Sequence, residues 1–215
     1  MKIYSFPTFN LTKLLYTAEE LGQDYELVLL DPSKMEHKSP EHLLRHPLGK
    51  VPALEWQGKC YFESNNLCRL MAELNGNRLY GDTPEAHAVV NQWIDFFGYQ
   101  VGKWMMVYAW EEAIKPAFFK KTPDANLIAE AAEFLAQQLP IVDDNLTANE
   151  FLAGAELTIA DTTAFALTQI ESFTSLDLGA YPNLVRWYGQ MAERPATARG
   201  LDKLPGRAIF PFLQK

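Results

Sequence analysis

The sequence is poor in cysteine and in basic residues. Its 215 residues include only two cysteines, Cys60 and Cys68, whose spacing matches neither a redox Cys-x-x-Cys pair nor a zinc site. We therefore expect no disulfide or metal to hold the fold, and we expect both thiols to be buried in ordinary packing. Acidic residues outnumber basic ones, 27 to 19, and the net charge of −8 argues against nucleic acid or an anionic membrane as partner.

Long apolar runs are also missing. No stretch of the sequence approaches the roughly 18 to 20 apolar residues that a membrane-spanning helix needs. The first residues, Met1 to Tyr4, show no basic-then-apolar targeting pattern and lead directly into a predicted strand. We therefore expect a soluble, cytoplasmic protein. On folding, a chain of this length buries roughly 70% of its unfolded surface, which is enough for a stable core without disulfide bonds.

The first 76 residues alternate between strand-like and helix-like patterns. Short apolar runs bounded by Pro or Gly predict strands, and a spacing of three to four residues between apolar positions predicts helices. We expect Asn10 or Thr12 to cap the first helix and Gly22 to end it. The order is a βαβαββα domain of the thioredoxin type over residues 1–76, with these elements: strand 2–6, helix 10–22, strand 25–30, helix 40–45, a hairpin over 53–62 and helix 65–74.

The pattern changes after residue 76. Residues 77–86 are polar, contain Gly81 and Pro84, and are predicted to be a linker. Residues 87–215 show only helical periods, which predicts an all-helical second domain. Thr158 followed by Asp161 has the form of a capping box, a structural signal with no catalytic role. The predicted helices of this half are 87–110, 127–146, 158–176 and 182–194.

The stretch from Gly49 to Ser64 contains most of the candidate binding residues. Pro52 cannot donate to a strand ladder, so it indicates a bend before a strand, where the backbone of Val51 could pair with a small peptide. A helix that begins at Ser64 presents unpaired N–H groups suited to a carboxylate, and the neighbouring Glu63 suits an amine. The plainer interpretation is a surface hairpin after which Ser64 only caps the helix.

Four motifs occur in an order that resembles the cytosolic glutathione transferase family over essentially the whole chain. The resemblance implies a thioredoxin-like domain followed by a helical one, a cis bond before Pro52, and a glutathione site that includes Val51, Pro52, Glu63 and Ser64. It also implies a hydrophobic co-substrate pocket between the domains, and usually a homodimer. The motifs are Gly49-Lys50-Val51-Pro52-Ala53-Leu54, Glu63-Ser64, Leu152-Ala153-Gly154 to Thr158-Ile159-Ala160-Asp161, and Tyr181-Pro182-Asn183-Leu184 leading to Trp187.

In this family the residue that activates the glutathione thiol follows the first strand. Thr8 is our first candidate, Asn10 the second and Ser5 the third, and Thr8 could instead be an ordinary turn hydroxyl. Lowering a thiol pKa by two units needs about 2.7 kcal/mol, which one hydroxyl bond to the sulfur and a helix N-terminus can supply. The segment Pro7 to Asn10 resembles most the bacterial group with Thr-Pro-Asn here, which is associated with glutathione-dependent disulfide reduction.

Further candidates follow from position. By resemblance Lys50 could meet the glycine carboxylate of glutathione, and Lys38 or His37 is an alternative for the same group. A pair of histidines, at 42 and 46, stands four apart as a helical metal pair would. No third ligand accompanies this pair, so we expect no metal site.

The first long helix of the second half is apolar on more than one face. Trp104 and Tyr108 on this helix, with Phe118 beyond it, could line an apolar substrate pocket. The same excess of aromatics would suit a dimer interface, and the sequence leaves both open. We expect a transferase that conjugates glutathione to small hydrophobic electrophiles. A glutathione-dependent disulfide reductase or peroxidase and a non-catalytic binding protein of this fold are the alternatives.

Overall fold

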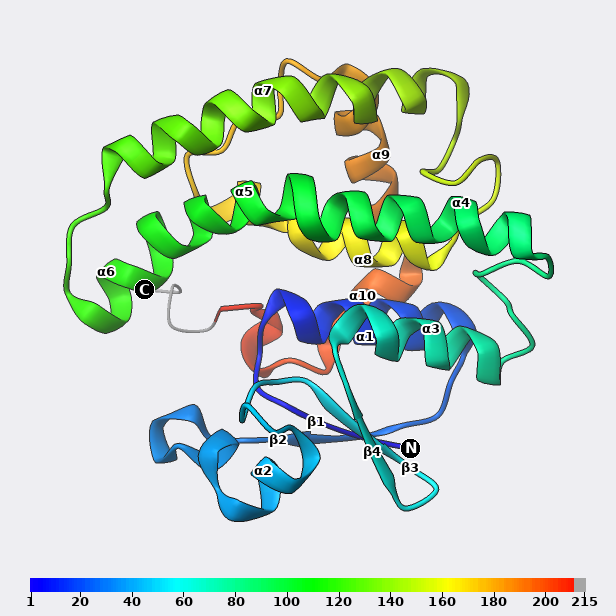
Figure 1. Ribbon diagram of the computed structural model, residues 1–215, viewed down its shortest axis with the longest axis vertical. Helices are drawn as coiled ribbons and strands as arrows, with labels where there is room; N and C mark the ends of the chain where they lie inside the picture. The colour runs from blue at the N-terminus through cyan, green and yellow to red at the C-terminus, as the bar shows by residue number, and fades with distance from the viewer. Residues whose placement is uncertain (211–215) are drawn as a thin grey trace. The chain divides into compact units, whose positions relative to one another are not determined.

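The computed structural model describes residues 1–210 as two compact units. The first unit comprises Met1–Arg78 together with the segment that begins at Pro195, and the second comprises Leu79–Arg194. Figure 1 follows the chain from the first unit through the second and back again. The first unit is therefore built from two segments that are far apart in the sequence.

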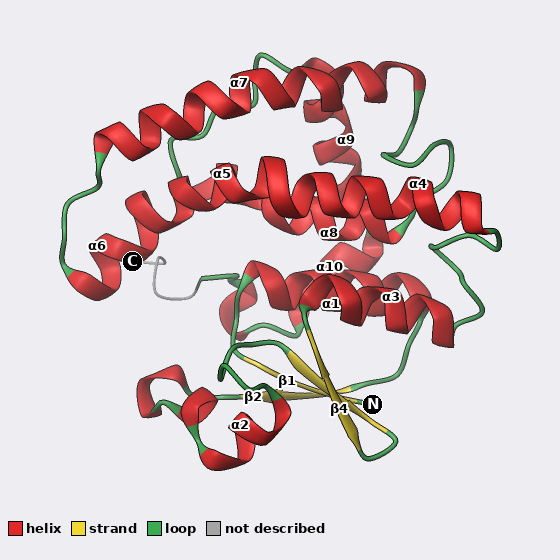
Figure 2. Cartoon of the chain, in the orientation of Figure 1, coloured by secondary structure: helices red, strands yellow, loops and turns green. Residues whose placement is uncertain are grey.

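The first unit holds a mixed four-stranded sheet in the order β2-β1-β3-β4. Strand β1 pairs in parallel with β2 and antiparallel with β3, and β3 forms a hairpin with β4. Figure 2 shows all strands in this one sheet. This topology confirms the predicted thioredoxin-like domain. The strands are β1 (Lys2–Ser5), β2 (Glu26–Leu29), β3 (Ala53–Trp56) and β4 (Lys59–Phe62).

Helices cover both faces of this sheet. Helices α1 (Phe9–Leu21) and α3 (Ser64–Leu74) lie on one face, and the short α2 (Pro40–Arg45) lies on the other (Figure 1). Helix α10 (Pro195–Asp202) packs along α1, where Gly200 allows close approach to the ring of Tyr16. The sequence did not predict α10 as a separate helix. The core between α1, α3 and the sheet consists of fully buried apolar side chains that include Ile3, Leu11, Leu14, Leu15, Leu54, Leu67 and Met71.

The start of α1 differs from the prediction. The N-cap is Thr8, whose Oγ1 accepts a hydrogen bond from the N–H of Leu11 at 3.1 Å, so the expectation of a cap at Asn10 or Thr12 was wrong. Thr8 takes the cap because its backbone is extended, with φ −158°, while the next residues are already helical. The predicted stop at Gly22 is confirmed, since Gly22 adopts φ +66° as a left-handed cap.

The two cysteines differ in burial. Cys68 is fully buried in α3, as predicted, whereas Cys60 is exposed, and that expectation was wrong. Strand β4 is the edge of the sheet, and most of its residues lie open to solvent. The edge position explains the exposure of Cys60.

The second unit begins with a long, irregular helical stretch where one regular helix was expected. Thr83 caps its start by accepting from Ala86 N, so α4 begins three residues before the predicted position. Two π-helical turns interrupt the stretch, and at one of them Gly102 lies so close to Phe97 O that a Cβ there would be 2.3 Å from that oxygen. The segments are α4 (Pro84–Asp95), η3 (Phe96–Val101), α5 (Gly102–Tyr108), η4 (Ala109–Ile114) and α6 (Lys115–Phe119).

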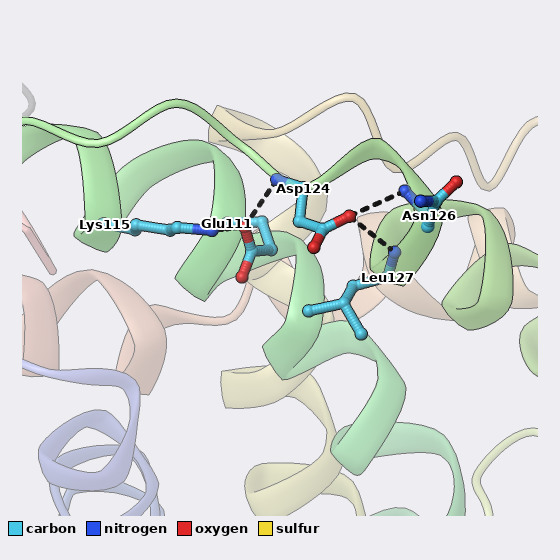
Figure 3. Close-up of polar contacts among 5 residues, drawn as sticks. All are labelled: Glu111, Lys115, Asp124, Asn126 and Leu127. Atoms are coloured by element: carbon cyan, nitrogen blue, oxygen red, sulfur yellow. Dashed lines mark hydrogen bonds and ion pairs between the residues drawn. The ribbon is translucent and has the colours of Figure 1, made fainter.

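A buried carboxylate ties the second π-helical turn to helix α7 (Ala125–Ala148). Glu111 in η4 is 2% exposed, and its Oε2 accepts hydrogen bonds from Lys115 Nζ and from the N–H of Asp124 at 2.7 Å (Figure 3). Asp124 in turn caps α7 by accepting from the N–H groups of Asn126 and Leu127. The π-helical turn therefore sets the position from which α7 begins.

The rest of the second unit is organised by the predicted capping box. Helix α8 (Ile159–Thr168) is buried along its whole length, and Thr158 and Asp161 cap it reciprocally, as expected. Asp161 also accepts from Trp187 Nε1 at 3.0 Å, which ties α8 to α9 (Pro182–Ala192). Helix α8 ends before the predicted 176, in a 3-10 turn over Gln169–Phe173. Over residues 1–210 no helix has both the length and the apolar character needed to cross a membrane.

Candidate functional site

The loop before β3 has the geometry that the resemblance implies. The Val51–Pro52 peptide bond is cis, as expected, and Pro52 is buried while Val51 is half-buried. Buried His42 on α2 contacts the carbonyl oxygen of Lys50 through Nε2 at 2.8 Å. His46 accepts from the N–H of Leu48 through Nδ1 at 3.2 Å. These two histidines therefore hold the backbone of the loop.

Gly49 makes the tight course of this loop possible. Its φ of +56° favours glycine, and a Cβ there would lie 2.6 Å from the carbonyl oxygen of His37 and 2.8 Å from Cδ of Lys38. Any larger residue would force the two segments apart. The glycine thus fixes where the chain enters the cis bond two residues later.

The start of α3 carries an unusual backbone. Glu63 has φ +70° and ψ 107°, a sparsely populated combination for a residue with a side chain, which costs on the order of 1–3 kcal/mol. Glu63 is the N-cap, but it makes no side-chain cap bond, and its side chain is exposed. Ser64 is the first residue of the helix and not its N-cap, and its Oγ donates to Asn10 Oδ1 at 3.2 Å. The first N–H groups of α3 therefore have no side-chain cap.

The three candidates for thiol activation lie in different surroundings. Thr8 is half-buried, and its Oγ1 accepts from Leu11, which leaves the hydroxyl hydrogen available to donate. Asn10 faces the start of α3 through its contact with Ser64. Ser5 is fully buried and donates to Phe6 O at 3.0 Å, so its hydroxyl does not reach a surface.

The candidates for the glycine carboxylate also differ. Lys38 Nζ donates to Leu48 O at 2.7 Å and so takes part in the loop itself. Lys50 is exposed, and no hydrogen bond or ion pair ties its side chain within residues 1–210. His37 packs edge-on against Phe6, and burial lowers the pKa of this imidazole. Of these three, Lys50 has the side chain that can turn to a ligand.

The aromatic candidates of the second unit occupy separate environments. Trp104 stacks on Phe134 of α7, with ring centroids 4.1 Å apart, and Lys103 lies over its other face. Tyr108 is buried, and burial together with the nearby Glu112 carboxylate raises the pKa of its phenol. Phe118 on α6 is 58% exposed. A common substrate pocket of Trp104, Tyr108 and Phe118 stays a prediction.

One charged residue near the site was missed. Lys13 lies on α1 and is 5% exposed, and its Nζ donates to Asn65 Oδ1 at 3.1 Å, directly after Ser64. Burial lowers the pKa of this ammonium from 10.5 to about 8. The residue pattern concealed this burial, because Lys13 lies on the side of α1 opposite Leu11 and Leu14, where a lysine is usually solvated.

Comparison with known families agrees with this geometry. The N-terminal domain of glutathione S-transferases matches residues 1–72, and their C-terminal domain matches residues 87–195. The chain belongs to the glutathione S-transferase family. Among its relatives, glutathione S-transferase 1 of Zea mays is 34% identical over 93% of this chain and 94% of its own length.

Two further relatives extend the comparison. The probable glutathione S-transferase GSTF2 of Oryza sativa is 33% identical over 93% of this chain and 94% of its own length. The structure of glutathione S-transferase I from maize, in complex with an atrazine glutathione conjugate, has a TM-score of 0.86 and 32% identity over 93% of this chain and 95% of that one. These relatives are plant proteins, so the expected likeness to the bacterial Thr-Pro-Asn group is not supported.

Proposed function

We propose that this protein is a glutathione S-transferase that binds glutathione in its first unit and transfers it to a small hydrophobic electrophile. The observation that carries the proposal is the uncapped start of α3, where Ser64 and the strained Glu63 stand side by side. The γ-glutamyl end of glutathione has an α-amino group for Glu63 and an α-carboxylate for the N–H groups at the start of α3. The Ser64 hydroxyl turns from Asn10 to donate to the same carboxylate. The backbone of Val51, beside the cis Pro52, pairs with the peptide part of glutathione.

The thiol is activated by Thr8. Its Oγ1 accepts from Leu11 N, so the hydroxyl hydrogen is free to donate to the sulfur and to stabilise the thiolate. The thiolate then attacks an electrophilic carbon, a C–S bond forms, and the leaving group departs with the electron pair of its own bond to that carbon. Lys50 pairs with the glycine carboxylate of glutathione, with Lys38 as the alternative.

Two expectations of the resemblance belong to this proposal. The protein acts as a homodimer in the cytoplasm, and an apolar surface that includes Trp104, Tyr108 and Phe118 receives the electrophile. The exposed ring of Phe118 and the half-buried ring of Trp104 are consistent with that use. Light scattering tests the dimer, and Phe118→Ala tests the pocket through the KM for the electrophile.

The role of Thr8 is tested by its hydroxyl alone. Thr8→Ser keeps the hydroxyl and the cap and should conjugate glutathione to a chlorodinitrobenzene at close to the wild-type rate. Thr8→Val removes the hydroxyl, so kcat/KM should fall about 10- to 100-fold, because a hydrogen bond to a charged group contributes about 1.5–3 kcal/mol. Circular dichroism checks that the variant stays folded without the cap. If Thr8→Val were as active as Thr8→Ser, Thr8 would not be the activating residue.

A further inference from the structure

The buried ammonium of Lys13 lies behind the start of α3. Lys13 and Asn10 are three positions apart on α1, so both reach the same neighbouring helix. Asn10 accepts from Ser64 Oγ at 3.2 Å, and Lys13 donates to Asn65 Oδ1 at 3.1 Å. Two side chains of α1 thus hold two consecutive residues in the first turn of α3.

Within residues 1–210, no buried acidic side chain forms an ion pair with this ammonium. Its hydrogen-bond partner, Asn65, is neutral, and the Cys68 thiol beside it stays neutral because burial raises its pKa to about 11. Glu63 acts on the ammonium through space, but its side chain is exposed. Arg69 on α3 adds a second positive charge near Cys68. On the α10 side of α1, the charged groups form their own ion pair, Arg199 with Glu19.

Such an arrangement disfavours the protonated lysine unless an anion binds nearby. Burial without a counter-ion lowers the pKa of Lys13 to about 8. Keeping this charge buried costs free energy, and a methionine of similar length would fill the same space without that cost. The anion that fits the place is the carboxylate expected at Ser64, one residue from the amide that Lys13 holds. Positive potential from a buried charge is screened less than that from a surface lysine.

We propose that Lys13 is a positioning residue of the glutathione site, which orients Asn65 and supplies the positive potential that holds the γ-glutamyl carboxylate at the start of α3. The inference rests on the proposed function, since it assigns a new residue to the same site. By linkage, the bound carboxylate stabilises the protonated amine, and affinity is lost as pH rises and Lys13 gives up its proton.

The test uses S-methylglutathione, which has no thiol to titrate, and calorimetry at about pH 7 and about pH 9.5, on either side of the Lys13 titration. Lys13→Met should weaken binding about tenfold at the lower pH, as one charge about 10 Å away in an effective dielectric of about 20 would do. The wild type should weaken more than Lys13→Met when the pH is raised. Lys13→Arg, whose charge does not titrate, should bind at the lower pH like the wild type and lose less at the higher pH.

Two further variants separate charge from structure. Lys13→Gln keeps an N–H donor for Asn65 but carries no charge, so it should bind between the wild type and Lys13→Met and show the weaker pH dependence of Lys13→Met. Wild-type affinity and pH dependence in the Gln variant would overturn the proposal. Lys59→Met removes an exposed lysine from β4 and should leave the affinity unchanged. Wild-type affinity and pH dependence in Lys13→Met would likewise overturn the role of Lys13. Failure of S-methylglutathione to bind the wild type would overturn the proposed function itself, and this inference with it.

Discussion

Replacing Lys13 by methionine should make the protein more stable at neutral pH, although it removes a hydrogen bond. Burial lowers the pKa of Lys13 from 10.5 to about 8, and lowering a pKa by one corresponds to about 1.4 kcal/mol, so keeping the buried ammonium costs about 3 kcal/mol at pH 7. Losing the bond to Asn65 costs about 1 kcal/mol. The net expectation for Lys13→Met is a gain of about 2 kcal/mol in the free energy of unfolding.

The gain must depend on pH with a definite sign. The folded-state pKa is below that of the unfolded chain, so between about pH 8 and 10.5 the unfolded wild type holds a proton that the folded form lacks. The stability of the wild type therefore rises with pH relative to the variant, and the advantage of Lys13→Met disappears by about pH 10. Other groups that titrate in this range are common to both proteins and cancel in the difference.

Urea unfolding followed by circular dichroism at several pH values measures this difference. Lys59→Met serves as the matched control, because Lys59 is exposed and its removal should change stability by less than about 0.5 kcal/mol. A Lys13→Met variant less stable than the wild type at pH 7, or one whose advantage stays constant up to pH 10, would refute the reasoning that Lys13 is a buried, costly cation.

Two other changes test the fold and the site. Asp161→Ala should lower the free energy of unfolding by about 4 kcal/mol, because it removes the cap of α8 and leaves the buried donors Leu152 N and Trp187 Nε1 unpaired. Thermal melts measure this loss, and Thr158→Ala, which loses only the cap, is the control. Glu63→Gln should weaken glutathione binding about tenfold without changing stability, because its side chain is exposed and caps nothing; calorimetry and the same melts check it, and unchanged affinity would remove Glu63 from the site.

The elements whose boundaries are set by local chemistry could be predicted from the sequence. Thr158 and Asp161 form the expected capping box, and Gly22 ends α1 as a left-handed cap. The cap of α1 could not be chosen from residue types, because Thr8, Asn10 and Thr12 all suit an N-cap and only the backbone decides between them. Helix α10 was missed because Pro195 after a helix usually signals a stop, whereas here it occupies the first position of a new helix.

The π-helical turns were beyond prediction for a different reason. Phe96–Val101 and Ala109–Ile114 each shift the helical period locally. The many aromatic residues around them place apolar side chains on every face of the helix, whichever period is assumed. A pattern that is apolar on all faces cannot show where the period changes. The same ambiguity hid which side of the helix Trp104 occupies, which depends on its stacking with Phe134, a residue 30 positions further along the chain.

The candidate site was predictable where a single residue type has one physical use. Pro52 indicated the bend, and Glu63 with Ser64 indicated the start of the helix, which lies at Ser64 in the structure. Lys13 was not recognised, because a lone lysine on a helix is usually solvated and its burial depends on how α3 packs against α1. Pairing between helices far apart in sequence is what the residue pattern alone could not supply.

The most direct test of the account is a calorimetric titration of reduced glutathione into the wild type and into Ser64→Ala. Binding turns the Ser64 hydroxyl from Asn10 to the carboxylate, which replaces a neutral hydrogen bond of about 1 kcal/mol by a charged one of about 1.5–3 kcal/mol. Removing the hydroxyl should therefore weaken binding about 2- to 30-fold. Ser33→Ala, which alters an exposed serine of the first unit, should bind like the wild type. Glutathione that binds the wild type and clearly less well the Ser64→Ala variant is the result we predict. No binding by the wild type, or equal affinity in Ser64→Ala, would contradict a glutathione site at the start of α3.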